Sequence, residues 1–171
     1  MKKMGLIVMF ALLAFVCRAQ DDSNADLVKV GDAMPAFTIV SDNGTKTSSS
    51  EFQGKVLLVN FFATWCPPCQ KELASVQKEL WPKYKDNKDF VMLVIGREHS
   101  DADLKVYNER KGFTFPLYPD KNRSIFAAFA KNLIPRSYVI DKSGKIIFAS
   151  KGYTDEEFAE LMQAIEGALK K

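Results

Sequence analysis

The sequence predicts an α/β domain in which a mixed central β-sheet lies between helices on both faces. Residues 55–62 and 90–95 are almost continuously apolar, as strands buried on both faces of a sheet are. Each run is followed by a segment whose apolar residues recur at helical spacing. Two further apolar segments, residues 137–140 and 146–149, flank a turn-rich stretch and predict an antiparallel hairpin. Strands that alternate with helices, followed by a hairpin and a last helix, favour a mixed sheet.

The N-terminus has the features of a secretory signal peptide, which we place at residues 1–19. Two lysines precede a short apolar run, and small residues stand at the end of the segment. We expect cleavage after Ala19 and therefore a periplasmic or otherwise exported protein. Lipidation of Cys17 is the alternative, and it would attach the protein to a membrane. Val16 fits that alternative poorly, because such signals favour a small residue before the cysteine.

The mature chain is predicted to begin with an extension and to have a balanced charge. Residues 20–30 are polar and aperiodic, which predicts a flexible leader before a single domain at residues 31–171. Residues 1–19 hold three of the 24 basic residues and no acid, so the remaining basic residues equal the 21 acidic ones in number. No basic stripe remains that would attract a nucleic acid. We therefore expect no nucleic-acid partner.

Short elements precede the first central strand. Pro35 introduces residues 36–40, whose alternating apolar and polar side chains predict an edge strand. A turn and a polar loop follow at residues 42–50. The strand at residues 55–62 comes next, and its apolar composition predicts burial between two layers.

A helix is predicted directly after this strand. It begins near Pro68, because the first turn of a helix tolerates proline. Pro82 interrupts the helical pattern and predicts a kink near residues 78–81. The side chains expected to be buried recur at spacings of three and four: Leu73, Val76, Leu80 and Tyr84.

The later elements carry start and stop signals. Ser100 and Asp103 form the pattern of a capping box after the strand at residues 90–95, and Gly112 ends the helix they begin. A shorter helix is predicted at residues 124–131. After the hairpin, Thr154 and Glu157 begin a last helix. Its predicted buried stripe is Phe158, Leu161, Met162, Ile165 and Leu169.

The segment with the clearest chemistry is Trp65-Cys66-Pro67-Pro68-Cys69, at the point where the strand gives way to the helix. Two cysteines separated by two residues in this setting are typical of a dithiol redox motif. The start of a helix favours the thiolate of the first cysteine. With Cys17 in the signal peptide, the mature chain keeps only this pair, whose ring is too small to stabilise the fold as a general cross-link. The pattern predicts thiol–disulfide exchange.

The chain resembles the exported TlpA/ResA-like thiol:disulfide oxidoreductases of the thioredoxin-like family. The resemblance covers roughly residues 30–170 and rests on residues 60–69, on Ile134-Pro135-Arg136 and on the hairpin at residues 138–146. It implies a thioredoxin-like fold, protein thiol or disulfide substrates, an upstream electron donor and no cofactor. We expect a monomer that acts as a reductant, because an exported compartment already oxidises thiols and a dithiol there is useful for supplying electrons.

Roles follow for the motif and the residues close to it. Cys66 is the expected nucleophile, exposed at the helix start, and Cys69 is expected to be more buried and to resolve the mixed disulfide. Family members carry an acid implicated in thiol activation at the position of Glu72. The alternative for Glu72 is an exposed acid that only complements the helix dipole. Asn60 takes the place of the buried aspartate of common thioredoxins and cannot act as a base.

The resemblance also implies a substrate-binding surface. Ile134-Pro135 corresponds to the cis-proline loop that faces the disulfide, where a substrate segment pairs like an added strand. Pro67, Pro68 and Trp65 complete the predicted substrate-binding set, with simple packing as the alternative for Trp65. Arg136 replaces the threonine frequent in the family, and we expect a solvated side chain there, or one that favours acidic partners. His99 is expected to be solvated and is left out of the catalytic set.

Three other classes of protein fit the sequence less well. A peroxiredoxin-like peroxidase has a threonine three residues before its cysteine, where this chain has Ala63. A structural zinc site needs four nitrogen or sulfur ligands, and the mature chain offers two cysteines and one distant histidine, so we expect no metal. A non-catalytic binding module of the same fold would not need to keep both Cys66 and Cys69.

Overall fold

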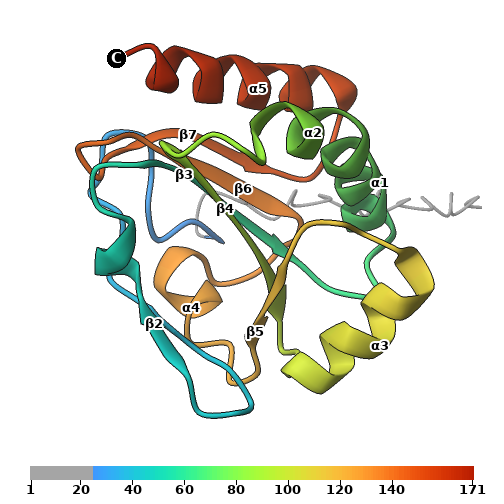
Figure 1. Cartoon of the computed structure of the whole chain (residues 1–171). Coiled ribbons are helices and arrows are strands. Elements are labelled where there is room, and N and C mark those ends of the chain that lie inside the picture. The colour runs from blue at the N-terminus through green and yellow to red at the C-terminus, as the bar shows by residue number, and fades with distance from the viewer. Residues whose placement is uncertain (1–24) are drawn as a thin grey trace, which may run out of the picture.

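The computed structural model describes residues 25–171, and Figure 1 shows its central five-stranded sheet. The predicted signal peptide, including Cys17, lies outside the described residues. The strand order is β5-β4-β3-β6-β7. The central strand β3 (Val56–Phe62) pairs in parallel with β4 (Phe90–Arg97) and antiparallel with β6 (Arg136–Ile140). The edges are β5 (Leu117–Asp120) and β7 (Ile146–Lys151). The sheet is mixed, as predicted.

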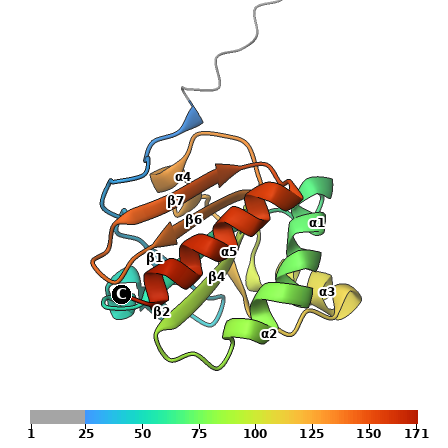
Figure 2. The same ribbon diagram turned by 90° about the horizontal axis from the view of Figure 1, so that it is seen from above.

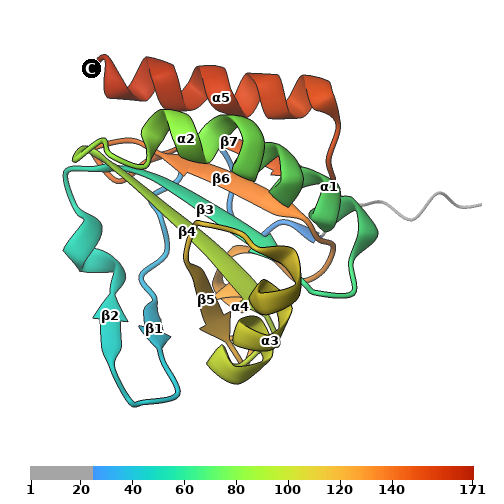
Figure 3. The ribbon, with the colours of Figure 1, turned by 45° about the vertical axis from the view of Figure 1, so that its right-hand side comes forward.

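Both faces of the sheet are covered. Helices α1 (Pro67–Ser75) and α5 (Asp155–Leu169) lie on one face, and α4 (Phe126–Phe129) lies on the other (Figures 1 and 3). Helix α5 packs on β3, β6 and β7, and seen from above it lies between β6 and β4 and runs in nearly the same direction as the strands (Figure 2). Helix α3 (Asp101–Lys111) packs beside the edge strand β5.

Strand β3 divides the apolar core into two parts because its side chains alternate between the faces of the sheet. Leu58 and Phe62 point into a cluster formed with α1 and α5. Phe61 belongs to the opposite cluster, where Phe126 and Phe129 of α4 pack against it. All seven residues of β3 are buried, which confirms the prediction of a fully covered strand.

The helix after β3 is interrupted where the sequence predicts a kink. It consists of α1, a π-helical turn at Val76–Leu80, and α2 (Trp81–Tyr84). The backbone N–H of Trp81 donates to the carbonyl of Val76, five residues back. The turn before Pro82 therefore contains one extra residue. A wide turn of this kind changes the pattern of hydrogen bonds along the helix without ending the helix.

Two predicted capping signals are confirmed. Ser100 and Asp103 form a reciprocal capping box at the start of α3, and Gly112 ends the helix in the left-handed conformation at φ 68°. At α5, the side chain of Thr154 accepts from the N–H of Glu157. The buried residues of α5 are Phe158, Leu161, Ile165 and Ala168, whereas Met162 and Leu169 are only partly covered.

The structure corrects the prediction for the early strands. Residues 36–40 do not form an edge strand of the main sheet, because β1 (Thr38–Val40) pairs only with β2 (Lys46–Ser48) in a separate two-stranded sheet. The predicted polar loop thus contributes a strand. One edge of the main sheet is instead β5, a strand that the sequence analysis missed. The short helix predicted at 124–131 is limited to Phe126–Phe129.

The described part of the predicted leader, residues 25–30, is attached to the domain. Ala25 is buried, and its carbonyl accepts from the N–H of Lys131 at 2.8 Å. Asp26 forms a β-bridge with Ala130. Short polar sequences look aperiodic even when they pair with a distant segment, so the expectation of a flexible segment is wrong for these residues. Among residues 25–171, no helix is both long and apolar enough to cross a membrane.

Candidate active site around the Cys66–Cys69 disulfide

The two cysteines lie at the N-terminus of α1 and are joined by a disulfide. Cys66 is the N-cap of the helix, and the N–H of Cys69 donates to Sγ of Cys66 at 3.3 Å. Pro67 and Pro68 fill the first helical positions, where a backbone N–H would have no partner within the helix. The helix N-terminus and one directed N–H therefore both face the sulfur of Cys66, which favours a negative charge on it.

Cys66 is less accessible in the disulfide form than the sequence analysis expects. Only 3% of its surface is exposed, and none of Cys69 is. Sγ of Cys66 lies 3.8 Å from the carbonyl oxygen of Ile134, so the loop before β6 covers it. The Ile134–Pro135 peptide bond is cis, as the resemblance implied. The expectation of an exposed Cys66 is wrong for the oxidised protein, whereas the expectation of a more buried Cys69 is met.

Glu72 is buried behind the disulfide in a closed set of polar contacts. Its Oε2 accepts from Nδ2 of Asn60 at 2.8 Å, and its Oε1 accepts from the hydroxyl of Ser137 at 2.8 Å. Asn60 Nδ2 also donates to Ser137 Oγ at 2.9 Å. The three residues come from β3, α1 and β6, so the sheet register brings Asn60 and Ser137 opposite each other beneath the helix.

The burial of Glu72 decides between the two interpretations of this acid. Only 3% of it is exposed, which excludes a solvated acid at the helix start. Burial raises the pKa of Glu72 from 4.5 to about 7, although the hydrogen bonds from Ser137 and Asn60 act in the opposite direction. Glu72 follows Cys69 by three residues and so lies on nearly the same face of α1. It is a group that can hold or release a proton near neutral pH.

Two exposed apolar side chains flank the disulfide. Trp65 is 63% exposed directly before Cys66, and Leu133 is exposed directly before Ile134. The guanidinium of Arg97 lies 5.6 Å from the centroid of a Trp65 ring and so stacks against one side of the indole. For Trp65 the exposure favours a contact surface over simple packing. Phe61 and Phe62, expected in the core, are fully buried.

His99 takes part in the site, which the sequence analysis did not foresee. Its Nε2 accepts from the N–H of Thr64 at 3.0 Å, in the loop that leads to Cys66. The imidazole is half-buried, and this burial lowers its pKa below the ordinary value. A signal for this contact existed: β3 and β4 are parallel neighbours, so the residues that follow them meet at the same edge of the sheet.

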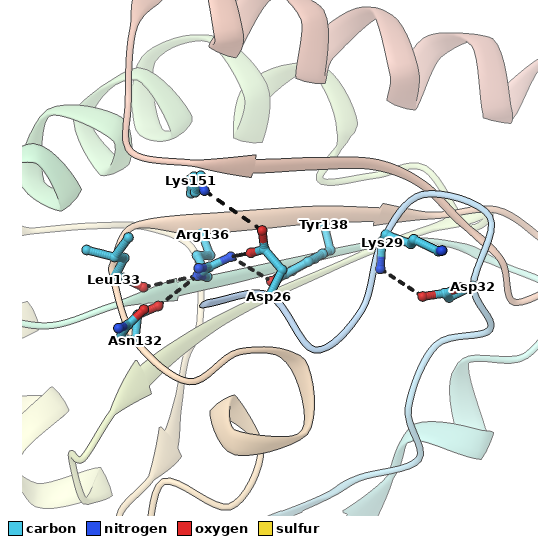
Figure 4. A network of polar contacts seen from close by, with 8 residues as sticks. All are labelled: Asp26, Lys29, Asp32, Asn132, Leu133, Arg136, Tyr138 and Lys151. Atoms are coloured by element: carbon cyan, nitrogen blue, oxygen red, sulfur yellow. Dashed lines mark hydrogen bonds and ion pairs between the residues drawn. The ribbon is translucent and has the colours of Figure 1, made fainter. Parts of the chain in front are cut away.

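Arg136 is the site residue for which the prediction is wrong. We expected a solvated side chain, but only 2% of Arg136 is exposed. It forms an ion pair with Asp26, which lies 110 positions earlier in the chain (Figure 4). A guanidinium is buried only where a partner and hydrogen-bond acceptors are available, and no local pattern reveals a partner so distant.

The described residues do not gather into a metal site. Across residues 25–171, no group of three or more histidine, cysteine, aspartate and glutamate side chains is placed to hold a metal ion.

Comparison with known proteins gives a consistent result. Residues 29–165 match the Redoxin family. Thiol-disulfide oxidoreductase ResA of Bacillus cereus is 30% identical, with 94% of this chain and 92% of that protein aligned. ResA of Geobacillus thermodenitrificans is 26% identical over 97% of this chain and 95% of its own length.

Solved structures agree with the sequence relatives. A solution structure of a protein from Bacteroides thetaiotaomicron superposes with a TM-score of 0.80 at 36% identity, covering 86% of this chain and 94% of that one. A thiol:disulfide interchange protein of the thioredoxin family from Chlorobium tepidum superposes with a TM-score of 0.66 at 27% identity, covering 83% and 99%.

Proposed function

The chain belongs to the Redoxin family and is a thiol-disulfide oxidoreductase similar to ResA, and from this premise we propose that it is exported and reduces disulfides in partner proteins. Its fold is thioredoxin-like, as the sequence resemblance implied. The observation that carries the proposal is the Cys66–Cys69 disulfide at the N-terminus of α1. The carbonyl of Ile134 lies against Sγ of Cys66, and Glu72 is buried in the same helix one turn after Cys69.

In the first step the thiolate of Cys66 attacks one sulfur of a partner disulfide. A mixed disulfide forms between Cys66 and the partner, and the second partner sulfur leaves as a thiolate. The helix N-terminus and the Cys69 N–H, 3.3 Å from Sγ in the oxidised protein, stabilise the attacking thiolate. Cys66 is therefore assigned as the nucleophile.

In the second step Cys69 attacks Sγ of Cys66. The mixed disulfide breaks, the partner leaves as its second thiolate, and the intramolecular disulfide of the structure forms. Two electrons have then passed from the dithiol to the partner. An upstream donor reduces Cys66 and Cys69 again before the next cycle.

Glu72 is assigned as the proton acceptor for Cys69. Cys69 is fully buried, so its thiol needs an internal group to take its proton. A carboxyl group whose pKa lies at about 7 can both accept and release a proton at neutral pH. Asn60, which takes the place of the aspartate of common thioredoxins, acts here as a hydrogen-bond donor to Glu72.

The substrate is proposed to lie across the Ile134-Pro135 loop. An extended segment of the partner would pair with the backbone of Ile134 as an added strand, which brings its disulfide to Cys66. Trp65, Pro67 and Pro68 are exposed next to Cys66 and would contact apolar side chains of the partner. Substrates are therefore unfolded or flexible protein segments that contain a disulfide.

The cellular setting is proposed from the N-terminal sequence. Residues 1–19 would direct export, and the protein would work as a monomer unless lipidation of Cys17 attaches it to a membrane. An oxidising compartment already forms disulfides, so a dithiol protein there would be useful as a reductant. Cell fractionation with mass spectrometry of the mature N-terminus tests this part, and a protein found in the cytoplasm with residues 1–19 intact would contradict it.

Two experiments test the chemistry. Cys69→Ser stops the reaction at the mixed disulfide, so protein partners should be recovered that dithiothreitol releases, whereas Cys66→Ser should recover none. Equilibration in glutathione or dithiothreitol buffers gives the reduction potential. A reductant requires a value towards the thioredoxin end of the range, about −270 mV, and a value near −120 mV would reverse the proposed direction.

A further inference from the structure

Arg136 connects the substrate loop to a distant part of the chain. Its Nε donates to the carbonyls of Asn132 at 3.0 Å and Leu133 at 3.2 Å. These are the two residues that precede Ile134, whose own carbonyl lies against the sulfur of Cys66. The same guanidinium is buried and faces Asp26 with its Nη1. Figure 4 shows the loop carbonyls on one side of the guanidinium and Asp26 on the other.

Asp26 is itself fixed by the backbone on both sides. The N–H of Leu27 donates to the carbonyl of Phe129 at 3.0 Å, and the carbonyl of Ala25 accepts from Lys131 at 2.8 Å. The second carboxylate oxygen of Asp26 lies 3.9 Å from Nζ of Lys151 on β7. The carboxylate is therefore held in place from the sheet edge and from the segment after α4.

The loop has a conformation that requires support. Leu133 has φ 64°, in the left-handed region that a leucine rarely adopts. The carbonyl oxygens of Asn132 and Leu133, on either side of this φ angle, both accept from Nε of one rigid, planar guanidinium. Successive side chains of a strand point to opposite faces of the sheet. The side chain of Ser137 therefore lies on the face opposite to that of Arg136, where it contacts Glu72.

We propose that Arg136 is a positioning residue that holds the Ile134 carbonyl at Cys66 in the orientation that receives an extended polypeptide, and that Asp26 is the anchor of Arg136. The N-terminal segment at residues 25–30 thereby becomes part of the substrate site, although it does not touch the sulfurs. This inference rests on the proposed function, since it explains how an extended substrate would be received.

Two kinds of disulfide substrate should depend differently on the orientation of the loop. A polypeptide disulfide must lie along Ile134, so its binding depends on the orientation of the loop. A small disulfide needs only an approach to Cys66, and its rate depends on the thiolate. A loss of positioning therefore weakens the first reaction and spares the second, whereas a general loss of structure weakens both.

The test uses the purified, stoichiometrically reduced protein. Asp26→Asn keeps the shape of the anchor without its charge, and Arg136→Lys keeps the charge without the planar fork. Asp32→Asn is the matched control, because Asp32 lies two residues beyond the segment at residues 25–30 and accepts from the N–H of Lys29 instead of from Arg136. The rate at which Cys66 and Cys69 are oxidised to the disulfide is measured as a function of the concentration of a disulfide-bonded peptide. The same measurement is repeated with hydroxyethyl disulfide as the substrate.

For Asp26→Asn and Arg136→Lys we expect the peptide concentration at half-maximal rate to rise about tenfold, because small misplacements of a binding group have large effects on reactivity. The rate with hydroxyethyl disulfide should stay within about twofold of the unsubstituted protein. Asp32→Asn should change neither. Equal losses with both disulfides, or no change with the peptide, would overturn the proposal.

A second measurement does not depend on catalysis. Amide hydrogen exchange of Lys131, which directly precedes the loop and whose N–H donates to the carbonyl of Ala25, should accelerate in Asp26→Asn and not in Asp32→Asn, because the anchor holds this segment. Unchanged exchange there would overturn the role of Arg136 even if the protein is fully active. If the unsubstituted protein reduces neither disulfide, the proposed function fails, and hydrogen exchange still decides whether Asp26 holds the loop.

Discussion

Glu72→Gln removes a buried acid and keeps its shape. The amide oxygen of glutamine can accept from Asn60 as Oε2 does now, and the amide nitrogen can donate to the hydroxyl of Ser137. We therefore expect the variant to fold. The difference between the two proteins is then the titration of one carboxyl group.

The magnitude of the effect on stability follows from the pKa of Glu72. Burial raises this pKa from 4.5 to about 7, and each pKa unit corresponds to about 1.4 kcal/mol. The folded protein thus keeps this proton at pH values where the unfolded chain has lost it. The contribution of Glu72 to the free energy of unfolding of the oxidised protein should therefore fall by about 3 kcal/mol as the pH rises from 4.5 to 7, and it should then stay constant.

Urea unfolding of the oxidised proteins at pH 4 to 8 measures this contribution. All other titrating groups are shared, so the difference between Glu72→Gln and the unsubstituted protein isolates Glu72. This difference should grow in favour of the variant by about 3 kcal/mol across the range. Glu79→Gln, an exposed acid of the same helical stretch, is the control and should show no such trend. Parallel curves for Glu72→Gln and the unsubstituted protein would refute the assignment of a raised pKa.

The same variant tests the second step of the mechanism. If Glu72 takes the proton of Cys69, then Glu72→Gln should slow the release of a mixed disulfide by about a hundredfold, as is typical when a general base is lost. The attack of Cys66 on the substrate should be almost unaffected. Stopped-flow measurements with an aromatic disulfide resolve the two steps, and equal rates of release would remove Glu72 from the mechanism.

Three further substitutions examine the surroundings of the disulfide. Ser137→Ala removes a hydrogen bond that lowers the pKa of Glu72, so the pH above which the contribution of Glu72 becomes constant should move above 7. An unchanged upper limit in the same urea experiment would contradict the role of Ser137. His99→Ala leaves the N–H of Thr64 without its acceptor and should lower the free energy of unfolding by about 1 kcal/mol, which thermal or urea unfolding at neutral pH would detect. Trp65→Ala should change the free energy of unfolding by less than about 0.5 kcal/mol because the side chain is exposed. It should nevertheless weaken saturation by a peptide disulfide, and unchanged saturation would show that Trp65 does not contact the substrate.

The parts of the fold that the sequence predicts well are those set by local rules. The central strands β3 and β4 are apolar over their length because both faces are covered. The helix starts at Ser100 and Thr154 carry side chains that satisfy free N–H groups within three residues. The cysteine pair is equally local, since its spacing alone brings both sulfurs to the first turn of a helix.

The residues that the sequence analysis misplaced depend on remote partners. Arg136 is buried because Asp26 and two loop carbonyls surround it, and neither its residue type nor its neighbours in sequence indicate this. The segment that begins at Asp26 supplies this partner from 110 positions earlier in the chain. Strand β5 contains Pro119 and is only four residues long, so it has too little alternation to stand out from a loop.

Strand β6 links the two halves of the proposed site through its alternation. Ser137 faces α1 and donates to the acid that would take a proton from Cys69, while Arg136 faces α4 and holds the loop that would receive the substrate. Arg136 and Ser137 are the two residues after Pro135, and their pairing with Phe61 and Asn60 on β3 fixes which side chain reaches which face. A slip of β6 by one residue would exchange the two faces and remove both functions together, because the side-chain period of a strand is two. The register of this one strand therefore determines both the protonation chemistry and the placement of the substrate.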